Sequence, residues 1–204
     1  QYDLNVREPL FGQPSLDAER TISYEVGISH QFSDNVALNL TAYYRDITGL
    51  IGTRYLFPFV DGRYTGYTLY VNEDYANNKG FEITVDMRPT KYFSGGLTYT
   101  YSVVKGSASS ETEQYPGTQE STQLYYLNWD RTHVFNASGT YTIPEAEGPE
   151  LFGSRIFENI DFSLILKASS GAPYTPSGRD VGFVEANSLR RPGVYNIDLM
   201  IGKE

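Results

Sequence analysis

The chain has 204 residues, and its 16 Lys and Arg against 25 Asp and Glu give a formal net charge of −9. It contains no cysteine, which excludes a disulfide framework, a thiol nucleophile and any cysteine-ligated metal. The acidic balance argues against a nucleic-acid partner, and no apolar run is long enough to predict a transmembrane helix.

Apolar and polar side chains alternate along most of the chain, which is typical of β-strands with two different faces. Turn residues such as Ser33, Asp34 and Asn35 separate neighbouring runs and predict antiparallel hairpins. Seven strands are expected, in chain order, over residues 22–32, 36–45, 81–88, 93–103, 132–143, 160–168 and 195–201.

The expected connections differ in length according to the end of the sheet on which they lie. Three long loops are expected on one end, over residues 51–74, 106–130 and 171–192. Loops of this length are uncommon in compact domains and are often functional. The shorter connections fall on the opposite end.

Two fold classes accommodate these strands, a transmembrane β-barrel and a soluble β-sandwich. The expected strands exceed the average of about 5–6 residues in globular proteins and match the roughly 9–11 residues that a tilted strand needs to cross a bilayer. The polar face carries mainly Ser, Thr, Asn and Gly with few lysines, and aromatic residues gather near both ends of the apolar face. These features favour an antiparallel transmembrane β-barrel. The alternative is a soluble β-sandwich that serves as a binding or adhesion module with aromatic-rich loops.

Seven strands are too few to close such a barrel, and bacterial single-chain barrels have even strand numbers. We therefore expect residues 1–204 to be a partial β-barrel domain. The remaining strands are expected to lie outside this sequence.

Six short motifs follow this strand order: 24–28 (YEVGI), 31–35 (QFSDN), 40–47 (LTAYYRDI), 78–83 (NKGFEI), 130–136 (DRTHVFN) and 171–176 (GAPYTP). Together they resemble the C-terminal third of the barrel of TonB-dependent outer-membrane receptors. The resemblance implies a 22-stranded barrel in the bacterial outer membrane, plugged by a separate N-terminal domain. Such a receptor takes up a scarce ligand with energy from the inner membrane.

The resemblance also implies partners. These are outer-membrane lipid, the plug domain of the same protein, a TonB-type energy-coupling protein and a small-molecule or oligomeric ligand such as a siderophore, vitamin, glycan or peptide. The plug, the energy-coupling box and the final strands are absent from this sequence, so transport by this part alone is not implied.

No enzymatic activity, cofactor or metal is predicted. His30 and His133 have no second histidine or carboxylate at ligand spacing. No phosphate-binding loop, dinucleotide fingerprint or nucleophile elbow occurs in the sequence.

Two sets of candidate site residues emerge. Charged side chains predicted to face the lumen and the plug are Glu25, Arg45, Glu82, Asp86, Arg88 and Asp198. They could hold the plug or pair across neighbouring strands. Candidate ligand-binding residues of the long loops are Tyr64, Tyr67, Tyr125, Trp129, Tyr174 and Arg179. Their aromatic rings could stack on a ligand or pack the loops against each other, and both readings remain open.

Overall fold

The computed structural model describes residues 10–64, 66–109, 124–150, 152–153, 155–176 and 185–203. In these ranges the chain is all β, which confirms the predicted fold class. None of the described residues belongs to a helix that is long and apolar enough to cross a membrane. The long strands are β2 (Arg20–Ser33), β3 (Val36–Leu56), β6 (Tyr67–Met87), β7 (Phe93–Gly106), β9 (His133–Ile143), β10 (Ile160–Ser169) and β13 (Val194–Lys203). The short strands are β1 (Leu10–Phe11), β4 (Phe59–Val60), β5 (Arg63–Tyr64), β8 (Tyr125–Tyr126), β11 (Pro173–Tyr174) and β12 (Leu189–Arg190).

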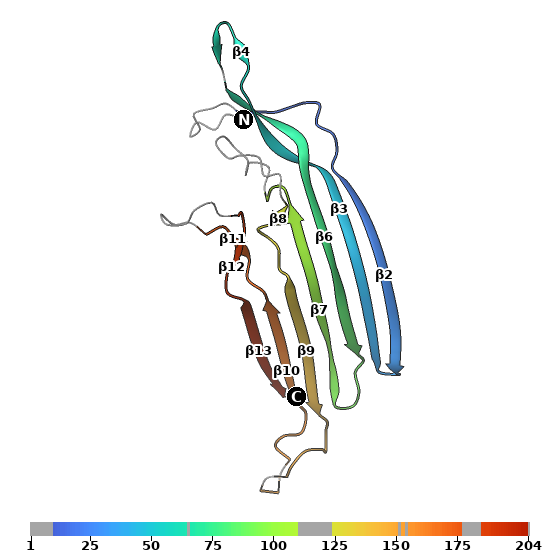
Figure 1. Ribbon diagram of the computed structural model, residues 1–204. Helices are drawn as coiled ribbons and strands as arrows, with labels where there is room; N and C mark the ends of the chain where they lie inside the picture. Colours follow the sequence, from blue (N-terminus) through green and yellow to red (C-terminus); the bar gives the residue numbers. More distant parts are fainter. Residues whose placement is uncertain are drawn as a thin grey trace.

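The seven long strands form one antiparallel sheet in the order β13-β10-β9-β7-β6-β3-β2 (Figure 1). Strands that follow each other along the sheet also follow each other in the chain, so the sheet is a meander of hairpins. The connections β3–β6, β7–β9 and β10–β13 lie at one end, which we call the long-loop end, and the other three lie at the short-turn end. Among the described residues, β2 and β13 do not pair with each other, so the sheet stays open.

The register of the strands gives the sheet two chemically different faces. One cross-strand row contains Ile28, Leu40, Ile83, Tyr99, Phe135, Ala168 and Tyr195. A neighbouring row on the opposite face contains Ser29, Asn39, Thr84, Thr98, Asn136, Lys167 and Asn196. We call these the apolar face and the polar face. The predicted alternation is therefore confirmed on all seven long strands.

The apolar face lacks a covering layer in the described part of the chain. Val26 is 70% exposed and Leu164 is 47% exposed, although both belong to this face. A water-soluble protein rarely leaves so wide an apolar surface bare. A lipid environment would cover it, and in lipid the strands need the continuous backbone pairing that this sheet has.

The apolar face ends well before β3 does. Tyr44 of β3, the last of its apolar residues on this face, pairs with Tyr24 and with Lys79, and the next row on the same face pairs Asp46 with Asn77. The apolar stretch of β3 thus covers residues 36–44, in line with the roughly 9–11 residues that cross a bilayer. The rest of β3 extends beyond this band at the long-loop end.

The expected long loop over residues 51–74 is wrong. β3 and β6 stay paired as far as Leu56 and Tyr67, so a two-stranded arm projects from the sheet (Figure 1). The chain reverses near Asp61 and Gly62, whose φ angles of 50° and 80° suit a two-residue hairpin turn. Continued pairing satisfies backbone groups that a loop would leave to water, and Asp-Gly is the turn signal that places the reversal here.

An ion pair links two connections at the short-turn end. Lys91 lies between β6 and β7, Glu147 lies between β9 and β10, and their side chains are in contact. The Lys91 ammonium holds the pKa of the Glu147 carboxyl below its ordinary value. The contact therefore stabilises the fold above the ordinary carboxylate pKa and is lost as the pH falls through the lowered one.

We expect acidification to loosen these two connections in the full-length protein. Amide hydrogen exchange of residues 88–92 and 144–150, corrected for intrinsic rate, should be faster at pH 3 than at pH 7. Glu147→Gln should remove most of this difference, because it has no carboxylate to protonate. A difference that persists in the variant would contradict the assignment.

The two faces make opposite predictions for a charge at neighbouring positions. Leu40→Arg places a cation on the apolar face and should cost about 2–4 kcal/mol if that face contacts lipid at mid-depth. Thr41→Arg places it on the polar face opposite Glu82 and should cost little. Unfolding of the full-length protein in lipid vesicles measures both, and equal costs would show that the face assignment is wrong.

Candidate functional site at the long-loop end

A small hydrophobic core lies at the long-loop end, where loop segments pack on the sheet. Its buried members are Ala76 of β6 together with Tyr125 and Leu127, which follow the β7 strand in the chain. Ile47 and Val104, which the register places on the polar face, pack against them. The loop residues therefore fold over the polar face and narrow the space in front of it.

Asp130 is the fully buried carboxylate of this region. One oxygen accepts the backbone N–H of Val104 at 2.7 Å. The other accepts the Thr132 hydroxyl at 2.9 Å and an Arg190 guanidinium N–H at 2.6 Å. A buried charge is tolerated when such partners replace its water, and these partners come from β7, from the residue before β9 and from β12.

Asn187 is a second connection between the same parts of the chain. Its side-chain amide donates to the Tyr126 carbonyl at 2.6 Å and to Oδ1 of Asn128 at 2.9 Å. Its backbone N–H donates to the Thr175 hydroxyl at 2.9 Å. The residue has a positive φ of 55°, a conformation that Asn adopts more readily than most residues. Residues 124–132 are thus joined by several hydrogen bonds to residues 185–191.

The Tyr126 ring contacts two cations. The Lys105 ammonium and the Arg190 guanidinium each lie 4.7 Å from the ring centroid. Such contacts contribute about 0.5–1 kcal/mol at exposed sites and more when they are desolvated. Arg190 therefore has two partners in the neighbouring segment, the carboxylate of Asp130 and the ring of Tyr126.

The structure places the predicted loop residues in different environments. Tyr125 is 5% exposed and packs in the core, whereas Trp129 is 55% exposed. Tyr174 is half-buried in β11. Tyr64 and Tyr67 lie in strands β5 and β6, so their placement in an unstructured loop is wrong for the reason given for the arm. Arg179 lies outside the described residues. A ligand role for any of these residues remains a prediction.

The predicted lumen-facing charges share one face of the sheet, with one exception. Glu25, Arg45, Glu82, Asp86 and Asp198 all fall on the polar face by register. Arg88 follows the last residue of β6 and lies in the connection to β7, where strand alternation no longer fixes its direction. Contact of this set with a plug remains a prediction.

These polar-face charges already have partners within the sheet. Arg45 and Glu25 form an ion pair at 3.0 Å across β2 and β3. Glu82, Asp86 and Asp198 each accept a hydrogen bond from a neutral side chain, namely Thr100, Asn39 and Asn196. Cross-strand pairing, one of the two roles considered for them, is therefore present for all of them except Asp198, whose partner Asn196 lies in the same strand, β13.

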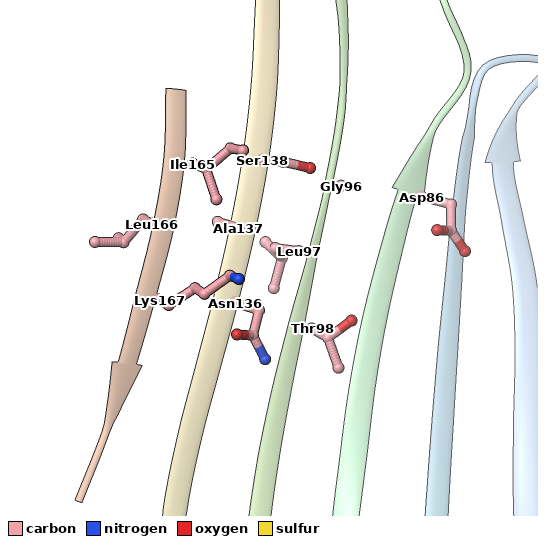
Figure 2. A pocket seen from close by; sticks show the side chains of 10 residues that line it. All are labelled: Asp86, Gly96, Leu97, Thr98, Asn136, Ala137, Ser138, Ile165, Leu166 and Lys167. Carbon is pink, nitrogen blue, oxygen red and sulfur yellow. The ribbon is translucent and has the colours of Figure 1, made fainter. Parts of the chain in front are cut away.

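A shallow depression of about 400 Å³ lies across β6, β7, β9 and β10 (Figure 2). Gly96 sits in the row between Asp86 and Ser138, and its missing side chain leaves space there. Figure 2 shows Lys167 extending from β10 towards Asn136 on β9. Polar side chains around a space of this size could contact a protein or solute on the polar face.

Sequence reasoning missed Asp130, Arg190 and Asn187 as site residues. Asp130 was noticed as part of a motif, but its burial depends on segments about 60 residues away in the chain. A buried charge has no local sequence signal, and the paired residue could not be identified without the fold. In the described part of the chain, no group of three or more His, Asp or Glu side chains is arranged to hold a metal ion.

The different burial of the two loop aromatics predicts different effects of their removal. Tyr125→Ala should cost about 3–5 kcal/mol of local stability, because it empties a packed site. Trp129→Ala should stay within about 0.5 kcal/mol, because most of its ring is already in solvent. Hydrogen exchange of residues 124–132 in the full-length protein would measure both, and a larger loss for Trp129→Ala would contradict the packing described here.

Several known structures have a similar fold. The FrpB iron transporter from Neisseria meningitidis (F3-3 variant) matches 97% of this chain and 26% of its own, with a TM-score of 0.60 and 14% identity. The ferric-catecholate import receptor Fiu from Escherichia coli K12 matches 94% and 22%, with a TM-score of 0.58 and 14% identity. FpvA from Pseudomonas aeruginosa, bound to heterologous pyoverdines, matches 91% and 21%, with a TM-score of 0.57 and 12% identity.

These similarities establish the fold, and the chain spans about a quarter of the length of each of these structures. A search of curated protein sequences gives no significant match. The family model described as "TonB dependent receptor-like, beta-barrel" matches residues 2–203, nearly the entire sequence. The chain therefore belongs to the TonB-dependent receptor-like β-barrel family.

Proposed function

We propose that this chain forms part of the barrel wall of a bacterial outer-membrane receptor that actively takes up a scarce ligand. The observation that carries the proposal is the two-faced sheet, in a chain whose sequence matches the receptor-barrel family over residues 2–203. The fold is that of proteins described as an iron transporter and as an import receptor. The protein acts as a transporter and receptor, not as an enzyme.

In this role the apolar face contacts outer-membrane lipid and the polar face lines the lumen. The row of Leu40, Ile83 and Tyr99 would meet hydrocarbon, while Thr84 and Thr98 would meet water or protein. The backbone groups between them are paired strand to strand, as hydrocarbon requires. This division of faces needs no residue of unusual reactivity, in agreement with a structural wall.

The lumen of such a barrel holds the plug domain of the same protein, which lies outside residues 1–204. The charged and amide side chains of the polar face, together with the depression near Gly96, offer hydrogen-bonding groups to that domain. A TonB-type coupling protein would act through the plug rather than through this sheet. The resemblance to receptor barrels supports both partners.

For the ligand, we propose an iron chelate of the siderophore class. The fold neighbours are described as transporting iron, importing ferric catecholate or binding a pyoverdine–iron complex. The exposed Trp129 and the half-buried Tyr174 at the long-loop end supply aromatic surface on which a catechol ring could stack. A vitamin, a glycan or a peptide would be handled by the same wall with other loop contacts.

The structure does not favour the soluble β-sandwich considered as an alternative. A sandwich needs a second sheet over the apolar face. In the described residues the other sheets are the two-stranded pairs β4–β5 and β11–β12, which lie at the long-loop end (Figure 1). The apolar face remains uncovered along its length.

Fractionation and uptake test the proposal in two steps. The full-length protein should sediment with the outer membrane, and recovery in the soluble periplasm would contradict the wall assignment. Cells that carry the gene should accumulate 55Fe offered as ferric catecholate, and a deletion strain or an uncoupler should abolish this. Outer-membrane location without iron uptake would overturn the ligand class alone.

A further inference from the structure

Two stretches of the chain that are far apart in sequence meet around one buried carboxylate at the long-loop end. The first stretch, residues 124–132, contains Asp130 and the exposed Trp129. The second, residues 171–176 and 185–191, contains the β11–β12 ladder, in which Arg190 pairs with Pro173 and Leu189 pairs with Tyr174. We call these the Trp129 segment and the Tyr174 segment. The Asp130–Arg190 ion pair at 2.6 Å connects them.

We propose that Asp130 is a positioning residue that holds the Trp129 segment and the Tyr174 segment as one rigid body on the barrel wall. The two segments then present their aromatic side chains to the ligand as a single surface. This ligand role rests on the proposed function and deepens it.

The first argument is the distribution of the partners of Asp130. Its carboxylate binds Arg190 in the Tyr174 segment and the backbone N–H of Val104 in β7. It also accepts the hydroxyl of Thr132 beside the first residue of β9. One side chain thereby ties both segments to the sheet. Any motion that separates the segments must break a charge-assisted hydrogen bond to a fully buried carboxylate.

The second argument is that neighbouring contacts act in the same direction. Arg190 also lies over the Tyr126 ring, and Asn187 donates to the Tyr126 carbonyl and to Asn128. These contacts run between the same two segments. We call these contacts between the two segments, together with the Asp130–Arg190 ion pair, the junction. Because several bonds hold the junction, separation of the segments is cooperative, and loss of the ion pair should loosen both segments at once.

The third argument is where the junction lies relative to the aromatic side chains. Trp129 directly precedes Asp130, and Tyr174 lies in the strand that pairs with the strand of Arg190. A ligand that stacks on both rings would otherwise lose affinity by ordering two independent loops. The ion pair reduces this cost because the segments are already ordered relative to each other.

Hydrogen exchange of the full-length protein in lipid vesicles tests the coupling without any ligand. Asp130→Asn keeps the size of the side chain and removes its charge. Arg190→Gln removes the partner charge. We expect each variant to speed exchange about tenfold or more in both segments, followed in peptides covering residues 124–132 and 185–191. The double variant should be much less affected than the product of the two single effects, because both remove the same interaction.

Glu25→Gln is the matched control. It breaks another Arg–carboxylate pair, Arg45–Glu25 at 3.0 Å, which joins β2 and β3 on the polar face, two strands along the sheet from Val104. It should leave exchange in both segments unchanged. Exchange in the β2–β3 hairpin should stay unchanged in the Asp130 and Arg190 variants, which distinguishes loss of the junction from general loss of the fold.

Two outcomes would overturn the proposal: faster exchange confined to the segment that carries the substitution, or single effects that multiply in the double variant. If Asp130→Asn fails to insert, Arg190→Gln and the milder Arg190→Lys decide the question in the same way. Ferric catecholate binding is measured separately. If the wild-type protein does not bind it, the ligand class proposed above fails, while the exchange result still decides whether Asp130 couples the segments.

Discussion

Every backbone N–H and C=O within hydrocarbon needs a partner, and this requirement organises the whole sheet. β10, β9, β7, β6 and β3 each pair with a neighbour on both edges. The pairing of β3 with β6 continues past the apolar band and forms the projecting arm. The backbone of the arm is paired like that of the rest of the sheet. The side chains on this face of β3 nevertheless change from Tyr44 in one row to Asp46 in the next. Backbone pairing is therefore continuous along β3 and β6, while the change from apolar to polar side chains marks where the apolar band ends.

Because successive residues of a strand point to opposite faces, the two faces of the sheet differ in chemistry. In the proposed function, outward side chains meet lipid and inward ones meet water, the plug or the loops that fold back. At the long-loop end the inward residues Ile47 and Val104 receive a covering of loop residues, which makes the small core there. The two faces of the sheet and the small core at its long-loop end thus arise from one alternating pattern, with burial added only where loop segments return to the sheet.

The fold could largely be predicted from the sequence because alternation is a local signal. Leu40 and Thr41 reveal their faces by parity alone, and the register bears this out. The length of the arm was missed because the Asp61–Gly62 turn was read as part of a loop. The junction at Asp130 could not be predicted, since its burial and its pairing with Arg190 depend on how two distant segments meet. Local alternation thus determines the long strands and their faces, and tertiary contacts determine the packing at the long-loop end.

The most direct test of the central claim is an accessibility scan of β3 in lipid vesicles. The full-length protein, freed of any other cysteine, would carry one cysteine at a time at residues 36–48. Each cysteine is labelled with a nitroxide. The collisions of the nitroxide with oxygen and with a water-soluble nickel chelate are then measured. We expect oxygen collisions to dominate at even positions up to Tyr44 and to be infrequent at odd positions. At Asp46 and Thr48, nickel collisions should dominate instead. Nickel collisions at Leu40 as frequent as those at Asp46 would contradict it.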